Sequence, residues 1–203
     1  EPHDYHIPLA SLGSLFIQNM DDIHSSVSAA YMAADPERTK KFAEILEIGE
    51  QDKLIGLSWM SHAPIVGKQK SCTLEDLEPI LAWGKANGYK FIGLDYVGTP
   101  QHPDIIDPYC LNMFIDIGGV CALIERCTFL VSVSNVNVHY AGAMGIPVYL
   151  LDANKLWYWN NRHDKYSYWY PSVSVYPREH MHAPWNLPVR AILEDIRDEY
   201  EHE

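Results

Sequence analysis

The sequence has no long apolar run and few cysteines. No apolar stretch reaches the roughly 18 residues of a membrane-spanning helix, and no signal peptide is recognisable. The cysteines show no CxxC spacing; they are Cys72, Cys110, Cys121 and Cys127. We therefore expect reduced thiols in or near the core of a cytoplasmic protein, with a disulfide as the alternative.

Positive charge is also scarce. The 203 residues include 15 Lys and Arg against 27 Asp and Glu, a net charge of −12, and no run of Lys or Arg stands out. This balance argues against nucleic acid and anionic membranes as partners, but it leaves room for a local anion site built from backbone amides and one or two lysines. With 47% apolar and 21% charged residues, the chain is expected to form one sizeable ordered domain. It begins with Glu1 rather than Met, so we expect it to be part of a longer protein.

Several catalytic and nucleotide-binding motifs are missing. Gly67-Lys68 suggests a P-loop, but that motif needs Gly where His62 stands and Ser or Thr where Gln69 stands. The first expected strand runs into GLSWMS instead of G-x-G-x-x-G, which disfavours dinucleotide binding. G-x-S-x-G and a catalytic cysteine context are absent as well. We expect no bound metal, because His180-Met181-His182 has a strand-like spacing and no cysteine partner nearby in the sequence.

What the chain does contain is an alternation of helices with short apolar strands. The expected strands cover 53–59, 89–96, 129–133 and 146–151. Such continuously apolar strands are typical of sheets buried on both faces. We therefore predict an α/β fold with an open, mostly parallel, Rossmann-like sheet and helices on both faces. Residues 1–50 are expected to form a leading segment and helix, and residues 51–203 the Rossmann-like domain.

Capping signals place the helices. Asp35 followed by Pro36 predicts a helix start, and Thr73-Leu-Glu-Asp76 resembles a capping box. Pro79 lies inside the helix that follows, so we expect a bend or a late start there. Gly145 is predicted to end a helix over 136–144. Further helices are expected at about 118–126 and 187–200, residues 1–34 are expected to be irregular, and 97–117 is not assigned.

Ligands of open α/β sheets bind beyond the carboxyl ends of the strands, and the turn 132–138 is one such place. Ser134 or Asn135 can cap the helix that follows, whose first amides carry a partial positive charge. This is a phosphate site on physical grounds, and Asn137 and His139 lie within its first turn or so. The alternative is that the polar residues are only caps and that the histidine is packed.

A second place is the loop 58–72, which holds two lysines. Lys68 and Lys70 at the carboxyl end of a strand suit a diphosphate in a chain this acidic, although exposed loop lysines are the alternative. Other polar candidates in this loop are Ser61, His62 and Ser71. The third place is the loop 95–101, which Asp95 opens.

Residues 157–176 hold eight of the chain's 24 aromatic residues. Aromatic faces stack on sugars and bases, which makes Trp157 a binding candidate. The alternative is that this segment is a folded cap over the edge of the sheet, with some of its rings also lining a pocket.

Several of these stretches resemble a known family. SVSNVNVHYAGAMGIPVYLL, LWYWNNRHDKYSYWYPSVSVY and a Pro-Trp before the last helix are similar to the C-terminal half of bacterial glycosyltransferase-like proteins. That half commonly follows tetratricopeptide repeats, and it resembles lipopolysaccharide heptosyltransferases and, more distantly, O-linked N-acetylglucosamine transferases. IPLASLGSLF, YMAADPERTKKF and LIGLSWMSHAPIVGKQKSCTLEDLEPIL extend the resemblance over most of residues 6–197.

The resemblance implies one half of a GT-B fold, the half that binds the nucleotide-sugar donor. It places Lys70 and Ser71 near the donor diphosphate and Ser134, Asn135 and His139 at the phosphate-facing helix start. It also implies catalysis without a metal or other cofactor, since helix dipoles and cations stabilise the departing diphosphate.

The resulting hypothesis is a glycosyltransferase that transfers a sugar from a UDP-, GDP- or ADP-linked donor to a glycan or protein acceptor. The acceptor half, or repeats, would lie in an N-terminal part of the longer protein, and His62 is the best candidate for a general base within this chain. An alternative is a binding or scaffold module that has lost catalysis. It is motivated by Ser134-Asn135 where heptosyltransferases have Asp-Thr, and by Tyr158 where many relatives have Arg. A different Rossmann-type enzyme or nucleotide binder is a third hypothesis.

Overall fold

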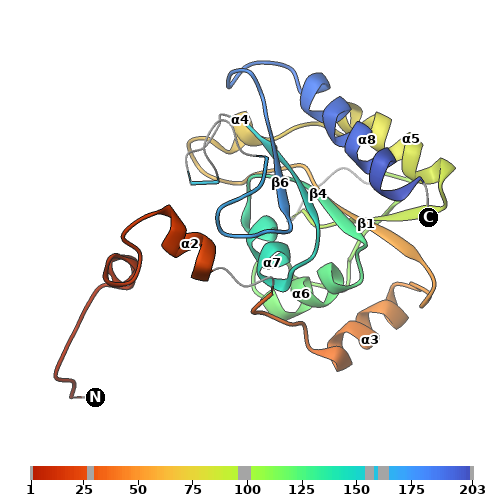
Figure 1. Ribbon diagram of the computed structural model, residues 1–203. Coiled ribbons are helices and arrows are strands. Elements are labelled where there is room, and N and C mark those ends of the chain that lie inside the picture. Colours follow the sequence, from red (N-terminus) through yellow and green to blue (C-terminus); the bar gives the residue numbers. More distant parts are fainter. Residues whose placement is uncertain (1, 27–29, 96–101, 154–157, 160–164, 202–203) are drawn as a thin grey trace.

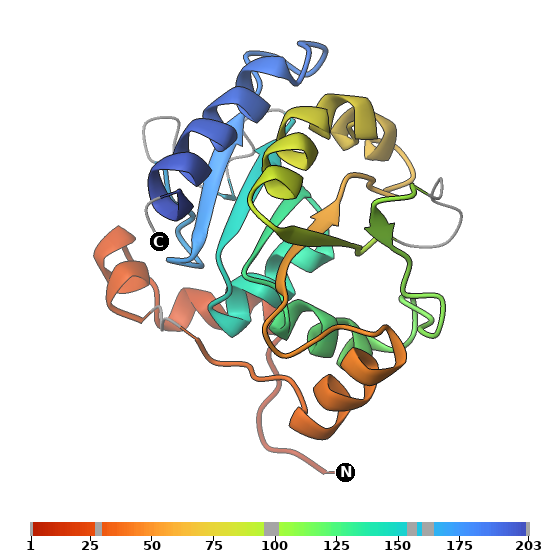
Figure 2. The ribbon, with the colours of Figure 1, turned by 90° about the vertical axis from the view of Figure 1, so that its right-hand side faces the viewer.

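The computed structural model describes residues 2–26, 30–95, 102–153, 158–159 and 165–201. Within these residues, one parallel sheet has the strand order β3-β2-β1-β4-β5-β6 (Figures 1 and 2). The strands are β1 (Lys53–Ser58), β2 (Tyr89–Gly93), β3 (Ile105–Ile106), β4 (Phe129–Val133), β5 (Val148–Asp152) and β6 (Val173–Pro177). The order reverses between β1 and β4, and in sheets of this type the crevice at such a reversal is where ligands bind.

Helices cover both faces of the sheet, as predicted. On one face lie α6 (Ile117–Glu125) and α7 (Val136–Met144), with α3 (Pro36–Ile45) packed against α6; on the other lie α5 (Leu74–Ala86) and α8 (Asn186–Tyr200) (Figure 1). Neighbouring residues of one strand enter different cores: Leu54 packs with α6 and its neighbours, and Ile55 with α5 and α8. Both side chains are fully buried, which explains why the strands are continuously apolar.

The predicted capping signals are confirmed. Asp35 accepts a hydrogen bond from the backbone N–H of Glu37 at the start of α3, and Thr73 and Asp76 form a reciprocal capping box at the start of α5. Gly145 ends α7 in the left-handed conformation, with φ of 76°. A late start of α5 at Pro79 is wrong, because the capping box already opens the helix at Leu74.

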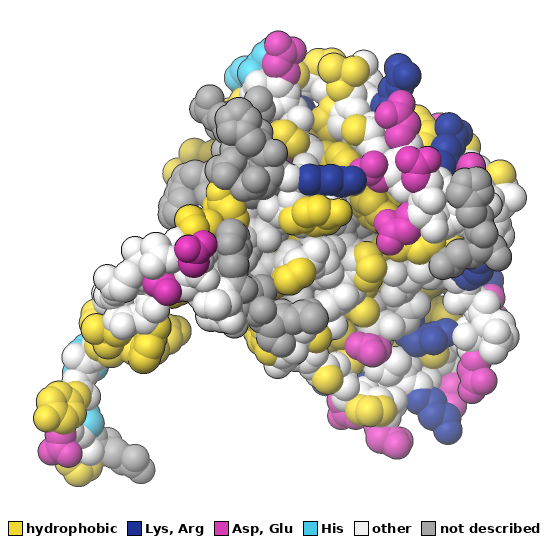
Figure 3. Space-filling view, viewed as in Figure 1, with side chains coloured by type: hydrophobic (Ala, Val, Ile, Leu, Met, Phe, Trp, Pro, Cys, Tyr) yellow, Lys and Arg dark blue, Asp and Glu magenta, His cyan; other side chains and the backbone are white. Residues whose placement is uncertain are grey.

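Residues 1–34 are not uniformly irregular as expected. They include α1 (Leu9–Leu12), the 3₁₀ turn η1 (Gly13–Leu15) and α2 (Met20–Ser26). The missed signal for α2 is a second reciprocal cap, in which Asn19 and Asp22 each accept from the other's backbone N–H. This arm extends away from the sheet, and apolar side chains such as Leu9 and Phe16 are exposed on it (Figures 1 and 3).

Sequence analysis also missed β6. Segment 165–167 runs along the outer edge of this strand, where Val175 donates to the Lys165 carbonyl at 2.7 Å and Ser167 donates to the Val173 carbonyl at 2.9 Å. Residues 165–167 of the aromatic segment therefore cover the edge of the sheet, as one of the two alternatives held, whereas Trp159 is buried in the core.

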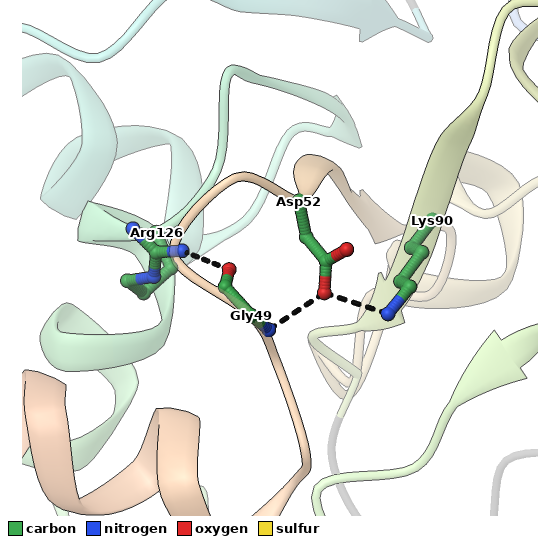
Figure 4. Close-up of polar contacts among 4 residues, drawn as sticks. All are labelled: Gly49, Asp52, Lys90 and Arg126. Atoms are coloured by element: carbon green, nitrogen blue, oxygen red, sulfur yellow. Dashed lines mark hydrogen bonds and ion pairs between the residues drawn. The ribbon is translucent and has the colours of Figure 1, made fainter.

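A polar cluster ties the amino ends of the strands together, at the edge opposite the expected site. Asp52, just before β1, accepts from Lys90 Nζ of β2 and from the Gly49 N–H, both at 2.6 Å (Figure 4). Arg126, at the end of α6, donates to the Gly49 carbonyl at 2.8 Å. The ion pair with Lys90 lowers the pKa of Asp52.

The four cysteines are free thiols: Cys72, Cys121 and Cys127 are buried, and Cys110 is exposed. Among the described residues, no helix is both long and apolar enough to cross a membrane.

Candidate functional site

A buried hydrogen-bond network joins the carboxyl ends of three strands at the reversal of strand order. Ser58 Oγ, at the end of β1, donates to Asp95 Oδ1 at 2.8 Å and accepts from Asn135 Nδ2 at 2.7 Å. Asn137 Nδ2 donates to Ser58 Oγ at 3.1 Å and to the Leu94 carbonyl at 2.7 Å. Residues after β1, β2 and β4 are thereby held in one cluster.

Asp95 fixes the beginning of the loop after β1. Besides the Ser58 hydroxyl, its carboxylate accepts from the backbone N–H of Trp59 at 2.9 Å and of Met60 at 3.2 Å. Burial raises the pKa of Asp95 to about 6, against the lowering effect of these hydrogen bonds and of His62. The carboxylate therefore faces the protein's own donors.

Asn135 and Asn137 are likewise engaged within the fold. Asn135 Oδ1 accepts from the Asn137 backbone N–H at 3.0 Å and so caps α7, as the sequence suggested. Asn137 is almost fully buried, and its Oδ1 atom has no hydrogen-bond partner among the described residues.

The loop after β1 contains a helical turn, α4 (Gly67–Lys70), that sequence analysis did not predict. Ser71 Oγ accepts from the Ser61 N–H at 2.9 Å and donates to the Gly67 carbonyl at 2.8 Å, which folds the loop back on itself. A Cβ at Gly67 would overlap the Ser61 carbonyl oxygen. This glycine is thus required by close backbone packing, which agrees with the absence of a P-loop.

Lys70 leaves this loop toward the start of α7. Its Nζ lies 3.5 Å from the Tyr158 hydroxyl, which lies 3.0 Å from Ser134 Oγ. Trp159 Nε1 also donates to Ser134 Oγ, at 3.1 Å. The Tyr158 hydroxyl therefore links a cation from the loop after β1 to a hydroxyl from the turn after β4, across the reversal of strand order. Lys68, by contrast, is exposed.

His139 lies on the same helix start and packs against aromatic rings. It stacks on Trp159 with ring centroids 4.8 Å apart, and its Nδ1 lies 3.1 Å from the Tyr170 hydroxyl. Burial, and then the charge of Lys70, lower the pKa of His139, so the imidazole is neutral at pH 7. The histidine is therefore packed, as the alternative reading of the sequence held, and donation from it to a phosphate stays a prediction.

The predicted site residues thus form two groups. Lys70, Ser134 and His139 contact the described aromatic residues. Asp95, Asn135 and Asn137 form the hydrogen-bond network at the carboxyl ends of the strands. Ser61 and Ser71 shape the loop after β1, and Trp157 lies outside the described residues.

His62 is exposed at the start of that loop, with its ring 6.2 Å from the Phe114 ring. Sequence analysis did not name Ser58 as part of the site, although its position at a strand's carboxyl end could have signalled its role. It singled out the aromatic segment 157–176 but did not name Tyr158, Trp159 or Tyr170 within it as site residues. In the part of the chain that the structure describes, no three His, Cys, Asp or Glu side chains are grouped as metal ligands.

Comparison with known proteins places this arrangement in context. No family model matches the chain. The structure resembles that of the glycosyl transferase family 9 protein from Veillonella parvula, with a TM-score of 0.51 and 16% identity. It also resembles E. coli ADP-heptose LPS heptosyltransferase II, with a TM-score of 0.50 and 13% identity. The chain has the fold of these glycosyltransferases.

The similarity covers only part of each relative. It extends over 73% of this chain and 42% of the Veillonella protein, and over 81% of this chain and 53% of the E. coli enzyme. In sequence, the chain is 24% identical over 180 residues to protein FlbA of Caulobacter vibrioides, which is 83% of this chain and 29% of FlbA. The chain thus spans about half or less of the length of these relatives.

Proposed function

We propose that this chain binds the diphosphate of a nucleoside-diphosphate sugar and serves as the donor-binding half of a GT-B-type glycosyltransferase. The observation that carries the proposal is the convergence of Lys70 with Ser134 at the start of α7. The two residues come from loops on either side of the strand-order reversal. Open α/β sheets bind ligands at this point, and the fold is shared with glycosyltransferases.

These groups suit the chemistry of sugar transfer. When the bond to the donor sugar breaks, negative charge gathers on the departing diphosphate. A lysine ammonium and the positive end of a helix stabilise that charge more than they stabilise the bound donor, which lowers the barrier. The imidazole of His139, whose pKa is lowered by burial and by the charge of Lys70, lies beside the same helix start. Because the whole chain has a net charge of −12, binding an anion requires a local group of donors of this kind.

We further propose that the remainder of the protein supplies the acceptor site. The two solved relatives are roughly twice as long as the part that this chain matches. A facing domain would hold the acceptor over the carboxyl edge of the sheet. His62, exposed on the loop that begins there, is the candidate general base within this chain.

A second candidate function is nucleotide binding without transfer. The polar side chains of the turn after β4 are engaged within the protein: Ser134 by Tyr158 and Trp159, and both asparagines by the strand ends. A scaffold module that keeps the donor fold but has lost turnover fits this observation.

A binding screen with matched lysine variants tests the proposal. Wild-type chain is titrated with UDP, GDP, ADP and their sugars while thermal unfolding is followed. A ligand at a hundredfold excess over its Kd stabilises the folded state by about 2.7 kcal/mol. We expect one nucleoside diphosphate to raise the melting temperature of the wild type and of Lys68→Met, and to have little effect on Lys70→Met.

Two results would contradict the proposal: no shift with any nucleotide, or equal losses in both lysine variants. Turnover decides between the two candidate functions. Hydrolysis or transfer of the bound sugar by the full-length protein supports the enzyme, and binding without turnover supports the scaffold.

A further inference from the structure

Two buried side chains from the C-terminal part of the chain hold the backbone on either side of Lys70. Arg178 Nη2 donates to the Gln69 carbonyl, and Trp185 Nε1 donates to the Ser71 carbonyl at 3.0 Å. One bond therefore holds the peptide group just before Lys70 and the other holds the peptide group after Ser71, and each comes from a residue far away in the sequence.

The two side chains also fix each other. The guanidinium carbon of Arg178 lies 3.9 Å from the centroid of the Trp185 ring, the geometry of a cation–π contact. Arg178 is only 6% exposed and Trp185 only 4%. Arg178 Nη1 donates to the Ala183 carbonyl at 3.0 Å, and its backbone N–H donates to the Asp152 carbonyl at 2.9 Å. The arginine is thus anchored at the ends of β5 and β6 before it reaches the loop.

This buried cation is not explained by the packing of the core alone. Burying a charge is costly unless it is well bonded, and Arg178 Nε is buried without a hydrogen-bond partner among the described residues. Two of the bonds that the side chain does make are to backbone carbonyls, and one of those carbonyls adjoins Lys70. An apolar residue could fill the space but could not hold that carbonyl.

The hydrogen bonds within the loop after β1 have a different role. Ser61, Gly67 and Ser71 bond with one another and set the shape of the turn. They connect it to the end of β1, which is separated from β6 by the two strands β4 and β5. The Arg178–Trp185 pair sets where the turn sits relative to β6 and α8, and hence the point from which the Lys70 side chain reaches toward Ser134.

We propose that Arg178 and Trp185 are positioning residues that order the backbone of Lys70 and thereby set the affinity of the diphosphate site. The inference rests on the proposed function for the identity of the ligand. A long lysine side chain loses conformational entropy when it is held against an anion. A backbone already fixed on both sides reduces the further ordering that binding requires.

The test uses conservative variants of the full chain. Arg178→Lys keeps the charge but loses the planar fork, and Trp185→Phe keeps the ring but loses the N–H donor. Arg190→Met is the matched control, because Arg190 is exposed on α8 and pairs with Glu194. The dissociation constant of the nucleoside diphosphate found in the screen is measured for each variant, with Lys70 intact and again with Lys70→Met.

We expect Arg178→Lys and Trp185→Phe each to weaken binding about tenfold when Lys70 is intact, which corresponds to the loss of one good hydrogen bond. In the Lys70→Met background the same changes should have less than about a twofold effect, because the group that they position is gone. The control should bind like the wild type in both backgrounds. Equal losses with and without Lys70 would show a merely structural role and overturn the inference.

Hydrogen exchange of the unliganded chain separates this inference from the proposed function. The backbone N–H groups of Lys70 and Ser71 donate to Val66 and Gly67 at 3.0 Å, so their exchange reports the order of the turn. At matched global stability, we expect both amides to exchange at least about fivefold faster in Arg178→Lys and Trp185→Phe than in Arg190→Met. If no nucleotide binds the wild type, the proposed function fails. The exchange result alone then tests whether Arg178 and Trp185 order the turn. Unchanged protection would then overturn the positioning role.

Discussion

The carboxyl group of Asp95 gives a quantitative test of the network at the strand ends. It is buried where β1, β2 and β4 come together, and burial raises its pKa from 3.8 to about 6. An acid whose pKa is higher in the folded state contributes stability that is fully present below the unfolded pKa. That contribution is lost as the pH rises through the folded pKa. Asp95 should therefore make the protein less stable between pH 4 and pH 7.

The size of this loss follows from the shift. One pKa unit is worth about 1.4 kcal/mol, so the shift of Asp95 amounts to about 3 kcal/mol in total. Part of this stability is already lost below pH 4, so the loss between pH 4 and pH 7 is about 2 kcal/mol. Asp95→Asn keeps the shape of the side chain but does not titrate. The stability of the wild type minus that of the variant should therefore fall by about 2 kcal/mol over this interval.

Urea unfolding of both proteins at several pH values measures this difference. With a typical dependence on urea, about 2 kcal/mol corresponds to a change of about 1 M in the separation of the two midpoints. Carboxylates other than Asp95 contribute alike to both proteins and cancel. The charge of His62 also acts on Asp95, so the pair is compared again in the His62→Gln background. Parallel pH profiles of wild type and Asp95→Asn would refute the assignment of a raised pKa.

Three further predictions concern neighbouring parts of the site. Gly67→Ala should destabilise the chain by about 1–3 kcal/mol in urea unfolding, because the new Cβ overlaps the Ser61 carbonyl. Gly13→Ala is the control and should leave the free energy of unfolding nearly unchanged, because Gly13 faces open space. Equal effects of the two substitutions would contradict the close packing at Gly67. Asn137→Ala should lose about 2 kcal/mol or more, because a buried carbonyl at the end of β2 loses its donor, and a loss below about 0.5 kcal/mol would argue against the network. His139 should titrate below the ordinary 6.5 in NMR spectra of the folded chain, and a midpoint above that value would mean that it is not buried as described.

Local signals in the sequence were sufficient for most helices. The cap at Asp35, the capping box at Thr73 and the glycine after α7 all act within a few residues, and each is present as predicted. The alternation of apolar strands with helices likewise predicted a buried parallel sheet. Where prediction failed locally, at α2 and α4, the elements are short, so propensity and periodicity say little about them.

The candidate site could likewise be predicted only in part. Sequence position alone placed Ser134, Asn135 and Lys70 in loops at the carboxyl ends of strands, where ligands of such folds bind. It could not show that the asparagines bond to Ser58 or that the lysine approaches Tyr158. Those contacts depend on which strands are neighbours.

The sequence by itself thus determined the class of the fold, the ends of the longer helices and the loops that could hold a ligand, because these follow from interactions between residues close together in the chain. The tertiary structure decided which side chains face a ligand and which hold the fold together. It places β1 beside β4 and the 165–167 segment along β6. It also brings the Arg178 guanidinium to the Gln69 carbonyl, next to Lys70. Each of these contacts joins residues far apart in the sequence, and it exists only once the strand order has been set by burial of both faces of the sheet.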